Sequence, residues 1–370
     1  MKQIPPPLDW SRLRVLPLAQ RKSLSRIEEI VVDPASSPRP VNEAAAAAVR
    51  RAAQHLHAAR DHAASRILIF GAHLLRNGAV LILERLLEQG WLTHLATNGA
   101  SSIHDWEFAW LGRSTEDVAA NVAAGTFGAW EETGRNIHLA LLAGGIAGEG
   151  YGRAVGRFIH EDGTTLPTAE SLEESLRTEP THPQTPARAD LLAVLRQHHL
   201  PPGRYEVLHR WKHLSLFREA FRHHVPITVH PGIGYDIIAN HPMFNGAVIG
   251  RAAERDFRQF AAAVDGLEGG VVLSIGSAIM GPQVFEKSLS CVHNLRLQEG
   301  RPVLRGHTIY VVDLQDDGQW DWSQGEPAKT NPAYYLRFCK SYSRMGGAMH
   351  YVQCDNLTFL HHLYHELMRQ

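Results

Sequence analysis

Small and hydroxyl-bearing residues follow two apolar runs in the first third of the chain. The run 67–70 ends at Gly71, and the run 92–97 leads into the segment 98–102, which reads Asn-Gly-Ala-Ser-Ser. Ligands of parallel α/β sheets bind beyond the carboxyl ends of the strands, where loop N–H groups and helix N-termini receive anionic groups. Both loops could therefore hold a dinucleotide. Neither contains a G-x-G-x-x-G or Walker sequence, so a purely structural crossover is an equally good interpretation.

Candidates for acid–base or nucleophilic chemistry occur in later segments. Asp236 lies in a loop after the apolar run 227–230, and it shares that loop with His230. His230 could act as a catalytic acid or base, and a hydrogen-bonded histidine at a sheet edge is an equally good interpretation. Ser277 has no evident histidine and aspartate partners, so we expect its hydroxyl to bond a ribose or phosphate. Lys340, on its sequence alone, is expected to be a surface lysine.

Two further patterns suggest ligand sites but favour structural roles. His361 and His365 have the i, i+4 spacing at which two imidazoles can share a zinc ion, and His362 lies between them. The order H-E-x-x-H is absent and solvated histidines are common near chain ends, so we expect no metal. The glycine-rich segment 143–156 could be a phosphate loop, but the residues before it have helical character. Close helix packing is the better explanation of its glycines.

Alternating hydrophobic patterns predict the elements that must position these residues. Short apolar runs predict buried strands, and apolar residues at helical spacing predict the helices between them. The expected strands are 67–70, 92–97, 227–230, 270–275 and 308–314, with another near 350–353; the longest expected helices are 42–64, 253–267 and 282–295. This alternation implies an α/β, Rossmann-like fold with a mostly parallel sheet and helices on both faces.

The same patterns divide the chain into an arm and one domain. Residues 1–41 are rich in proline and charge, and we expect them to wrap the surface of the domain or of a neighbouring subunit. Residues 42–370 are predicted to form a single α/β nucleotide-binding domain, with a helical and polar excursion at about 143–210. Within this excursion, the segment 160–186 is rich in Thr, Pro and Glu, which is typical of a surface or mobile loop.

The composition argues against several classes of protein. The 370 residues include 37 basic and 38 acidic residues, so no global field attracts nucleic acid or an anionic membrane. The three cysteines form no C-x-x-C pair, which favours a reducing compartment over a disulfide framework. The sequence has no apolar run of membrane-spanning length and no signal-peptide core near Met1. We therefore expect a soluble cytoplasmic protein that handles small molecules.

Several segments together resemble deoxyhypusine synthases, in order from about residue 66 to the C-terminus. FGAHLLRNG and TNGASSIHD resemble the first nucleotide-binding unit of that family, and HVPITVHPGIGYDII resembles its strand and acidic loop. VVLSIGSAIMGP resembles its glycine-rich strand end, and PAYYLRFCK the segment that carries its essential lysine. Family positions that match are a threonine at Thr97, an acidic residue at Asp236, a glycine at Gly276 and the essential lysine at Lys340; Phe338 falls on a tryptophan.

The resemblance implies an enzyme that binds NAD and forms tetramers with active sites near subunit interfaces. NAD would accept hydride from a C–N carbon, and Lys340 would capture the resulting imine as a Schiff base. We assign catalysis to Lys340, Asp236 and His230, and substrate binding to Tyr334 and Phe338. The assigned cofactor residues follow the strands: Ala72, His73, Asn77, Thr97, Asn98, Gly99, Ser101, Gly276, Ser277, Asp313 and Asp355.

The sequence departs from the family pattern at several positions. Tyr334 stands where the family has a substrate-binding glutamate, and Gly281 where it has a histidine. His73 and Asn77 stand where it has Asn and Ser. A polyamine carries several positive charges and needs several carboxylates to replace its water. We therefore predict an amine or polyamine-like substrate that has diverged from spermidine.

Three classes of function remain open. The leading one is an NAD-dependent transferase or lyase that acts on an amine, as a homotetramer. In this interpretation Lys340 lies near the nicotinamide, close to Asp236 and to an aromatic wall of Tyr334, Tyr335 and Phe338. The second is an enzyme of the same fold that uses NAD as a deaminase or an NAD-cleaving hydrolase. The third is a catalytically silent nucleotide-binding protein with a regulatory or scaffold role.

Overall fold

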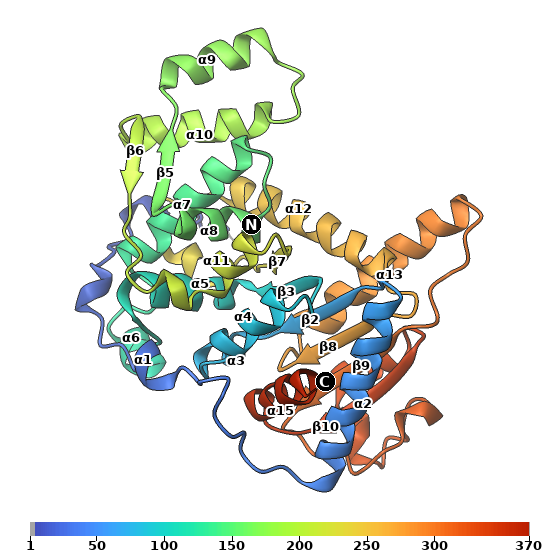
Figure 1. Cartoon of the computed structure of the whole chain (residues 1–370). Coiled ribbons are helices and arrows are strands. Elements are labelled where there is room, and N and C mark those ends of the chain that lie inside the picture. Colours follow the sequence, from blue (N-terminus) through green and yellow to red (C-terminus); the bar gives the residue numbers. More distant parts are fainter. Residues whose placement is uncertain (1–3, 370) are drawn as a thin grey trace.

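A six-stranded parallel sheet forms the centre of the computed structural model, which describes residues 4–369 (Figure 1). The strand order is β10-β9-β8-β2-β3-β7, and every neighbouring pair is parallel. The strands are β2 (Arg66–Phe70), β3 (His94–Asn98), β7 (Ile227–His230), β8 (Val271–Ile275), β9 (Thr308–Asp313) and β10 (Ala348–Gln353). Helices cover both faces, which confirms the predicted Rossmann-like α/β fold.

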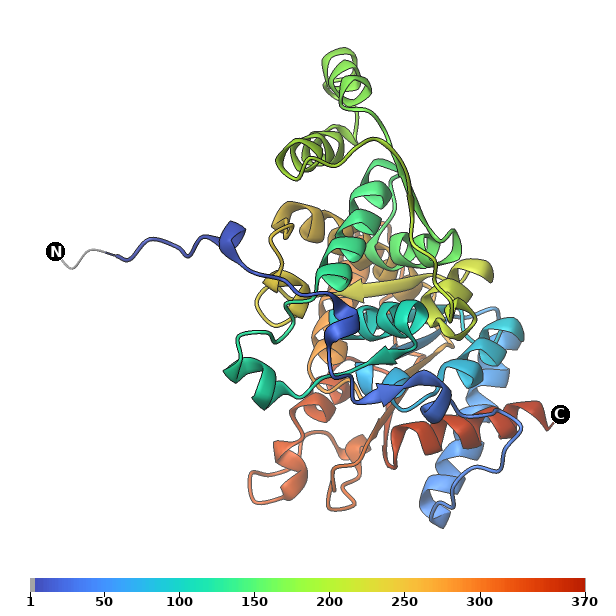
Figure 2. The same ribbon diagram turned by 90° about the vertical axis from the view of Figure 1, so that its left-hand side faces the viewer.

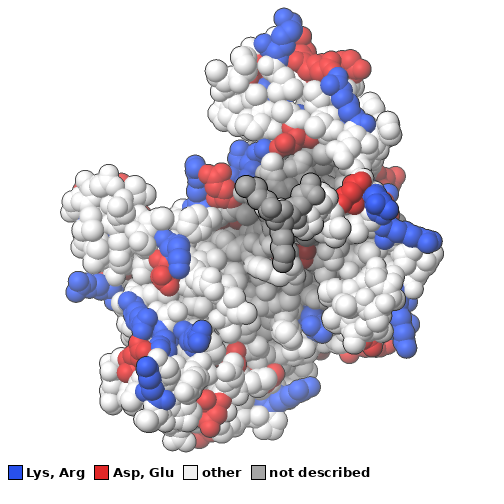
Figure 3. Space-filling model, turned by 180° about the vertical axis from the view of Figure 1, so that it is seen from behind, with Lys and Arg blue, Asp and Glu red and all other residues white. Residues whose placement is uncertain are grey.

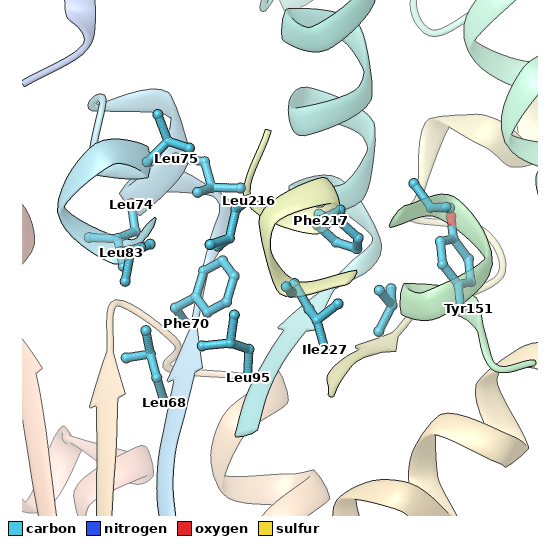
Figure 4. Packing of buried hydrophobic residues seen from close by; sticks show 14 of the residues in the cluster. Leu68, Phe70, Leu74, Leu75, Leu83, Leu95, Tyr151, Leu216, Phe217 and Ile227 are labelled. Carbon is cyan, nitrogen blue, oxygen red and sulfur yellow. The ribbon is translucent and has the colours of Figure 1, made fainter. Parts of the chain in front are cut away.

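The side chains of each strand alternate between two cores, as the two-residue period of a strand requires. In β2, Leu68 and Phe70 face the first core, and Ile67 and Ile69 face the second. Figure 4 shows Phe70 of the first core close to Leu216, which comes from a covering helix. The sheet is therefore buried on both faces, and ligands can reach it only at its ends and edges.

The first core is covered mainly by α2 (Glu43–Asp61), α4 (Val80–Glu88), α5 (Gly99–Leu111), α7 (Glu131–Ile146), α8 (Tyr151–His160), α11 (Leu216–Arg222) and α15 (Asn356–Met368). The second is covered by α13 (Met280–Gln298), α14 (Arg337–Ser343) and the end of α12 (Gly246–Asp265). Shorter helices are α1 (Ile27–Ile30), α3 (Ala72–Arg76) and α6 (Val118–Ala123). Among the helices of residues 4–369, none has both the length and the apolar composition needed to cross a membrane.

Side-chain caps explain where two of the helices begin. The Oδ1 atom of Asn42 accepts the N–H of Ala45 at 2.8 Å and starts α2, as the sequence predicts. Asn98 Oδ1 accepts the N–H of Ser101 at 3.1 Å and starts α5 at once after β3. This cap places the start of α5 at Gly99, inside the segment 98–102 that the sequence interpretation took as a loop.

The chain leaves the middle of the sheet in two directions. From β2 it proceeds outward to β3 and β7, and from β8 it proceeds outward on the other side to β9 and β10. The strand order thus reverses between β2 and β8, and at such a switch point the loops at the carboxyl ends separate to form a crevice. Gly71 and Gly276 are the residues that follow these two strands.

The N-terminal arm packs on the domain over only part of its length. Leu18 is fully buried, and β1 (Ser25–Arg26) pairs with β4 (Arg113–Ser114). Ahead of this part, the chain projects away from the body of the molecule (Figure 2). Ile4 and Leu8 on the projecting segment are 89% and 81% exposed, so residues 4–369 leave these apolar side chains largely uncovered.

The excursion predicted at about 143–210 contains a folded projection (Figure 1). It consists of β5 (Gly163–Leu166), α9 (Ala169–Thr178), α10 (Thr185–Gln197) and β6 (Gly203–Glu206). Thr168 caps α9 through the N–H of Ser171, and Leu172 is buried beneath it. The interpretation of 160–186 as a loop is therefore wrong for β5 and α9, which are regular elements with mostly polar residues.

Acidic and basic side chains are interspersed over the face of the molecule shown in Figure 3. This mixture agrees with the formal net charge of −1. The face in view therefore presents no broad basic area of the kind that follows a nucleic-acid backbone.

Candidate functional site

Two glycines bring the loops after β2 and β8 into contact at the switch point. A Cβ atom on Gly71 would lie 2.2 Å from the carbonyl oxygen of Gly276. Gly276 has a φ of 62°, and a Cβ atom there would lie 2.4 Å from Nδ2 of Asn356. Both positions therefore require glycine, and their backbones lie in close contact at the point where ligands bind in folds of this kind.

The predicted cofactor residues after β2 lie on the short helix α3. Ala72 is buried, whereas the side chains of His73 and Asn77 are exposed. Arg76 ends this helix. Because a five-residue helix is about 7 Å long, Arg76 lies close to the switch point.

At the end of β3, the predicted hydroxyl groups bond to one another. Thr97 is fully buried, and its Oγ1 atom bonds to the carbonyl oxygen of Phe70 at 2.8 Å and to Oγ of Ser101 at 2.5 Å. Ser101 Oγ in turn donates to Asn98 Oδ1 at 3.0 Å. These residues fix the start of α5 beside the switch point, and their hydroxyls are already partnered within the protein.

The predicted residues after β8, β9 and β10 also support their own loops. Ser277 Oγ accepts the N–H of Gly281 at 3.1 Å. Asp313 accepts the N–H of Gln315, and Asp355 accepts the N–H of Thr358 as the N-cap of α15. These side chains shape the crevice but offer few free hydrogen-bonding atoms to a ligand.

Asn356, which the sequence interpretation missed, differs from these neighbours because one of its side-chain atoms lacks a hydrogen bond. Its Oδ1 atom is buried and has no hydrogen-bond partner within residues 4–369. Its Nδ2 atom lies against Gly276. An unpartnered buried amide is costly, so Asn356 is the side chain best placed to bond a ligand in the crevice. The sequence signal was its position directly after Asp355 at a strand end.

Asp236 lies beyond the carboxyl end of β7, at the other side of the same edge of the sheet. Its side chain is only 5% exposed, and its Oδ2 atom accepts the N–H of Gly232 at 2.8 Å. Gly99, the first residue of α5, has no room for a Cβ atom because this carboxylate would lie 2.2 Å from it. Burial raises the pKa of Asp236 to about 6.

A cavity of about 260 Å³ opens beside Asp236. One face of α5, formed by Ala100, Ile103, His104 and Glu107, makes one wall. The remaining lining residues are Arg21, Arg76, Thr115, Glu116, Val118, Phe127, Tyr235, Asp236 and Ile237. A pocket of this size with apolar walls and a few convergent charges is suited to a small polar molecule.

The charges that line this cavity differ in how they are paired. Arg21 and Glu107 form a buried bidentate ion pair with two contacts of 2.8 Å. Burial lowers the pKa of His104 to about 4, so this imidazole is neutral at pH 7. Arg76 Nε is buried, and within the described chain it has no hydrogen-bond partner. Among the described residues that line the cavity, Arg76 and Asp236 are thus the charged groups outside the cluster of Arg21, Glu107 and Glu116.

His230 does not line this cavity. Its Nε2 atom bonds to Oγ1 of Thr228 at 3.2 Å, and its ring packs edge-on against Phe260 at 5.5 Å. Burial lowers the pKa of His230 to about 4. This environment matches the hydrogen-bonded histidine at a sheet edge; an acid–base role for His230 stays a prediction.

Lys340 lies on α14, over the half of the sheet that begins with β8. Its Nζ atom is 2.5 Å from Oε1 of Glu326 and 3.6 Å from the centre of the Tyr334 ring. Tyr342 of the same helix donates to Ser274 Oγ in β8 at 3.1 Å. The aromatic neighbour Tyr334 was predicted correctly, but the carboxylate beside the lysine is Glu326, which was missed.

The expected proximity of Lys340 to Asp236 stays a prediction. Phe338, the second predicted substrate residue, is buried and packs near Tyr351 of β10. The strands β7 and β8 are separated by β2 and β3, so these two strands are about 14 Å apart. Lys340 and Phe338 thus lie on one half, and Asp236 on the other.

Comparisons with known proteins gave structural neighbours only. No protein-family model and no curated protein sequence matches the chain. Unliganded AgrE has a TM-score of 0.44 at 16% identity, over 89% of this chain and 34% of that one. ArgZ, an arginine dihydrolase from the ornithine–ammonia cycle in cyanobacteria, has a TM-score of 0.42 at 14% identity, over 90% and 34%. A conserved LOR/SDH protein from Methanococcus maripaludis S2 has a TM-score of 0.40 at 15% identity, over 91% and 72%.

The chain thus spans about one third of the length of AgrE and ArgZ. AgrE has also been solved in a ternary complex with ornithine and NAD+, with a TM-score of 0.42 and 16% identity to this chain. All of these TM-scores are below 0.5, so these likenesses carry no argument about the function of this chain.

Proposed function

We propose that the chain is an NAD-dependent enzyme that acts on the C–N carbon of an amine. The observation that carries the proposal is that one short helix joins the switch point to the cavity beside Asp236. Helix α3 begins at the switch point and ends at Arg76, in the cavity that holds Asp236. A cofactor in the crevice and a substrate in the cavity would therefore be neighbours.

The residues at the switch point suit a dinucleotide. The close backbones of Gly71 and Gly276 leave no side chain at the base of the crevice, and the open amide of Asn356 can bond a hydroxyl or carboxamide. When bound, NAD would supply the acceptor for a hydride. The resemblance to deoxyhypusine synthases, which also predicts NAD, supports the same assignment.

In the cavity, Asp236 is suited to bind the ammonium group of the substrate. With a pKa of about 6, the carboxylate is mostly ionised at pH 7 and is lost as the pH falls below 6. An ammonium ion would also repay the cost of burying that charge. Arg76 can in turn bind an anionic group. We therefore propose a substrate that carries both an amine and a negative charge, unlike spermidine.

The fate of the oxidised substrate separates two candidate reactions. The bound ammonium must first release a proton to water; loss of hydride from the carbon of the free amine to NAD then leaves an iminium ion. In the deoxyhypusine synthase-like reaction, the free amine of Lys340 attacks this carbon and a Schiff base replaces the substrate's own amine. In a deaminase, water attacks instead, and the products are a carbonyl compound and an ammonium ion.

The surroundings of Lys340 favour the deaminase. Nζ is held by Glu326 and by the ring of Tyr334, as expected of an ammonium group, and an ammonium has no lone pair with which to attack. Lys340 in this arrangement is a fixed positive charge. The transferase or lyase reaction requires the ion pair to open first.

The test combines binding with turnover. Calorimetry with NAD should give binding that Gly276→Asp abolishes and that Asn356→Ala weakens about tenfold or more. A panel of amines, with and without a carboxylate, is then followed by NADH absorbance and by ammonium release. Absence of NAD binding at millimolar concentration would refute the cofactor assignment. Tight binding without turnover of any amine would favour a catalytically silent regulatory protein.

We also propose that the chain forms a homo-oligomer, most simply a tetramer, with sites near the subunit interfaces. The projecting arm exposes Ile4 and Leu8, and the indole of Trp10 donates to Ala239, close in sequence to Asp236 (Figure 2). An arm with this course could cover apolar surface on another subunit. Light scattering at micromolar concentration should give a mass of several chains; a monomer would contradict the proposal.

A further inference from the structure

A second cavity, of about 1020 Å³, lies at the opposite end of β7 from Asp236. Its walls are the start of β7, the loop before α8, the middle of α12, and two prolines, one just before α10 and one in its first turn. Because a four-residue strand is about 13 Å long, this cavity is separate from the one proposed to bind the amine. Its volume is at the upper end of the range of small-molecule pockets.

The cavity is lined by four arginines. Three of them come from α12 at i, i+4 and i+7, so they share one face of that helix, and the fourth comes from α8. They are Arg251, Arg255, Arg258 and Arg153. Arginine is the side chain that binds phosphate groups in bidentate geometry.

Arg255 differs from the other three in its partners. Arg153, Arg251 and Arg258 pair with Glu149, Asp190 and Glu254. Arg255 has no carboxylate within 4.0 Å among residues 4–369. Its Nη1 atom donates to the carbonyl oxygen of Gly148 at 2.5 Å. A guanidinium has five N–H donors, so most of those on Arg255 are open to a ligand.

The glycine-rich segment beside the cavity is shaped around a carboxylate of the protein itself. Asp256 accepts the N–H groups of Gly152 at 2.9 Å and Val229 at 2.7 Å. A Cβ atom on Gly150 would lie 1.9 Å from Asp256 Oδ1, and one on Gly152 would lie 1.8 Å from the carbonyl oxygen of Ile227. Close packing therefore explains these glycines, as predicted. Because Asp256 fills the N-terminus of α8, an anion in the cavity must be bound by the arginines.

Less polar residues also line the cavity. Phe221 carries the guanidinium of Arg153 over its ring at 4.9 Å, and Pro183, Pro186 and Pro226 are among the lining residues. Such residues suit a flat heterocycle, which can stack on an arginine plane or an aromatic ring. The cavity thus combines cationic residues with stacking residues.

We propose that this cavity binds a nucleotide, with its phosphate groups at Arg255 and its base near Phe221. The site is additional to the NAD crevice at the switch point and does not depend on the proposed amine chemistry. The cavity lies where α8, α12 and the α9–α10 projection meet (Figure 1). A nucleotide could therefore bind there whether or not the substrate is bound beside Asp236.

The experiment is calorimetric titration of the full chain with ADP, with inorganic tripolyphosphate and adenosine as competitors. ADP should bind, and Arg255→Gln should weaken it by about 10- to 100-fold. Tripolyphosphate should compete. The matched control is Arg305→Gln, which removes an exposed arginine outside the cavity and should leave ADP affinity unchanged. Unfolding temperatures of both variants check that the fold is retained.

Asn356→Ala separates this site from the switch point. It should weaken NAD without changing ADP affinity, and Arg255→Gln should do the reverse. If Asn356→Ala weakens ADP and Arg255→Gln does not, ADP binds at the switch point and the proposal fails. A loss of less than threefold with Arg255→Gln, or competition by adenosine but not by tripolyphosphate, would also overturn it.

Discussion

The two halves of the sheet edge handle buried charge in opposite ways. Beyond β3 and β7, Asp236 and Arg76 point at one cavity, and within the described chain neither has an oppositely charged partner. Beyond β8, the ammonium of Lys340 is matched by Glu326 and Tyr334. Unpaired buried charges cost folding free energy, so they are kept where a ligand completes them. This difference is the reason for proposing the substrate site on the Asp236 half, although the lysine is the more suggestive residue in the sequence.

The largest effect is expected from removing the charge of Asp236. Asp236→Asn keeps the shape of the side chain but leaves the substrate ammonium without its counter-ion. We expect kcat/KM for the amine to fall by about 10²- to 10³-fold, as for other truncated buried charge pairs. The measurement is NADH formation over a range of substrate concentrations. NAD affinity is the control, and it should not change; an Asp236→Asn variant of full activity would move the substrate site elsewhere.

A second contrast concerns the stability of the two ion pairs. Glu107→Gln removes the bidentate partner of buried Arg21 and leaves it only the longer contact of 3.9 Å with Glu116, so it should lower the free energy of unfolding by about 3 kcal/mol. Glu326 lies at the surface, and its ion pairs with Lys340 and Arg344 lower the pKa of its carboxyl. Glu326→Gln should change the unfolding midpoint much less. Urea unfolding of both variants gives the comparison, and equal losses would contradict it.

The third prediction uses the pH dependence of the same aspartate. The pKa of Asp236 is about 6 in the folded protein against an ordinary value of 3.8, so the folded state prefers the protonated form. Its charge therefore destabilises the fold above pH 6, by about 3 kcal/mol, and this penalty disappears as the pH falls toward 4. Asp236→Asn should thus be more stable than the parent at pH 8 by about 2–3 kcal/mol.

Urea unfolding at pH 8, 6 and 4 measures that difference, which should shrink toward zero at pH 4. Asp105 and Asp256 titrate in the same range, but they are present in both proteins and cancel in the comparison. A constant difference at all three pH values would show that Asp236 is not buried as a charge.

The fold could be predicted from sequence because it depends on local patterns. The strand 227–230 was predicted at its observed bounds, since a short apolar run after Pro226 has few alternatives. The helix α9 was missed because its surface is polar almost all round, with Leu172 as its one buried residue. The order of the strands was open until the structure showed the reversal between β2 and β8.

The site was harder to predict because its key partners are far apart in the chain. Arg21 and Glu107 are separated by 86 residues, and no sequence pattern in either segment predicts that they form a pair. Arg76 and Asp236 share a cavity only because α3 and the loop after β7 end at the same edge. Residue type predicted Asp236 and the hydroxyls at strand ends as candidates. Residue type could not show which polar atoms are hydrogen-bonded within the protein and which lack a partner, as Oδ1 of Asn356 does among residues 4–369.

The smallest effect is expected at Lys340, where the two candidate reactions differ. If Lys340 is a fixed charge, Lys340→Ala should lower ammonium release by less than about tenfold, because water and not the amine attacks the iminium ion. Incubation of the enzyme with NAD, substrate and borohydride should then leave the lysine unlabelled. If the ion pair with Glu326 opens during turnover, the amine becomes a nucleophile and a reduced adduct should appear on the peptide that carries Lys340. Lys340→Arg keeps the positive charge but cannot form the adduct, so it is the matched control. An inactive Lys340→Arg variant, together with a labelled parent enzyme, would establish covalent catalysis and place the chemistry on the β8 half of the edge.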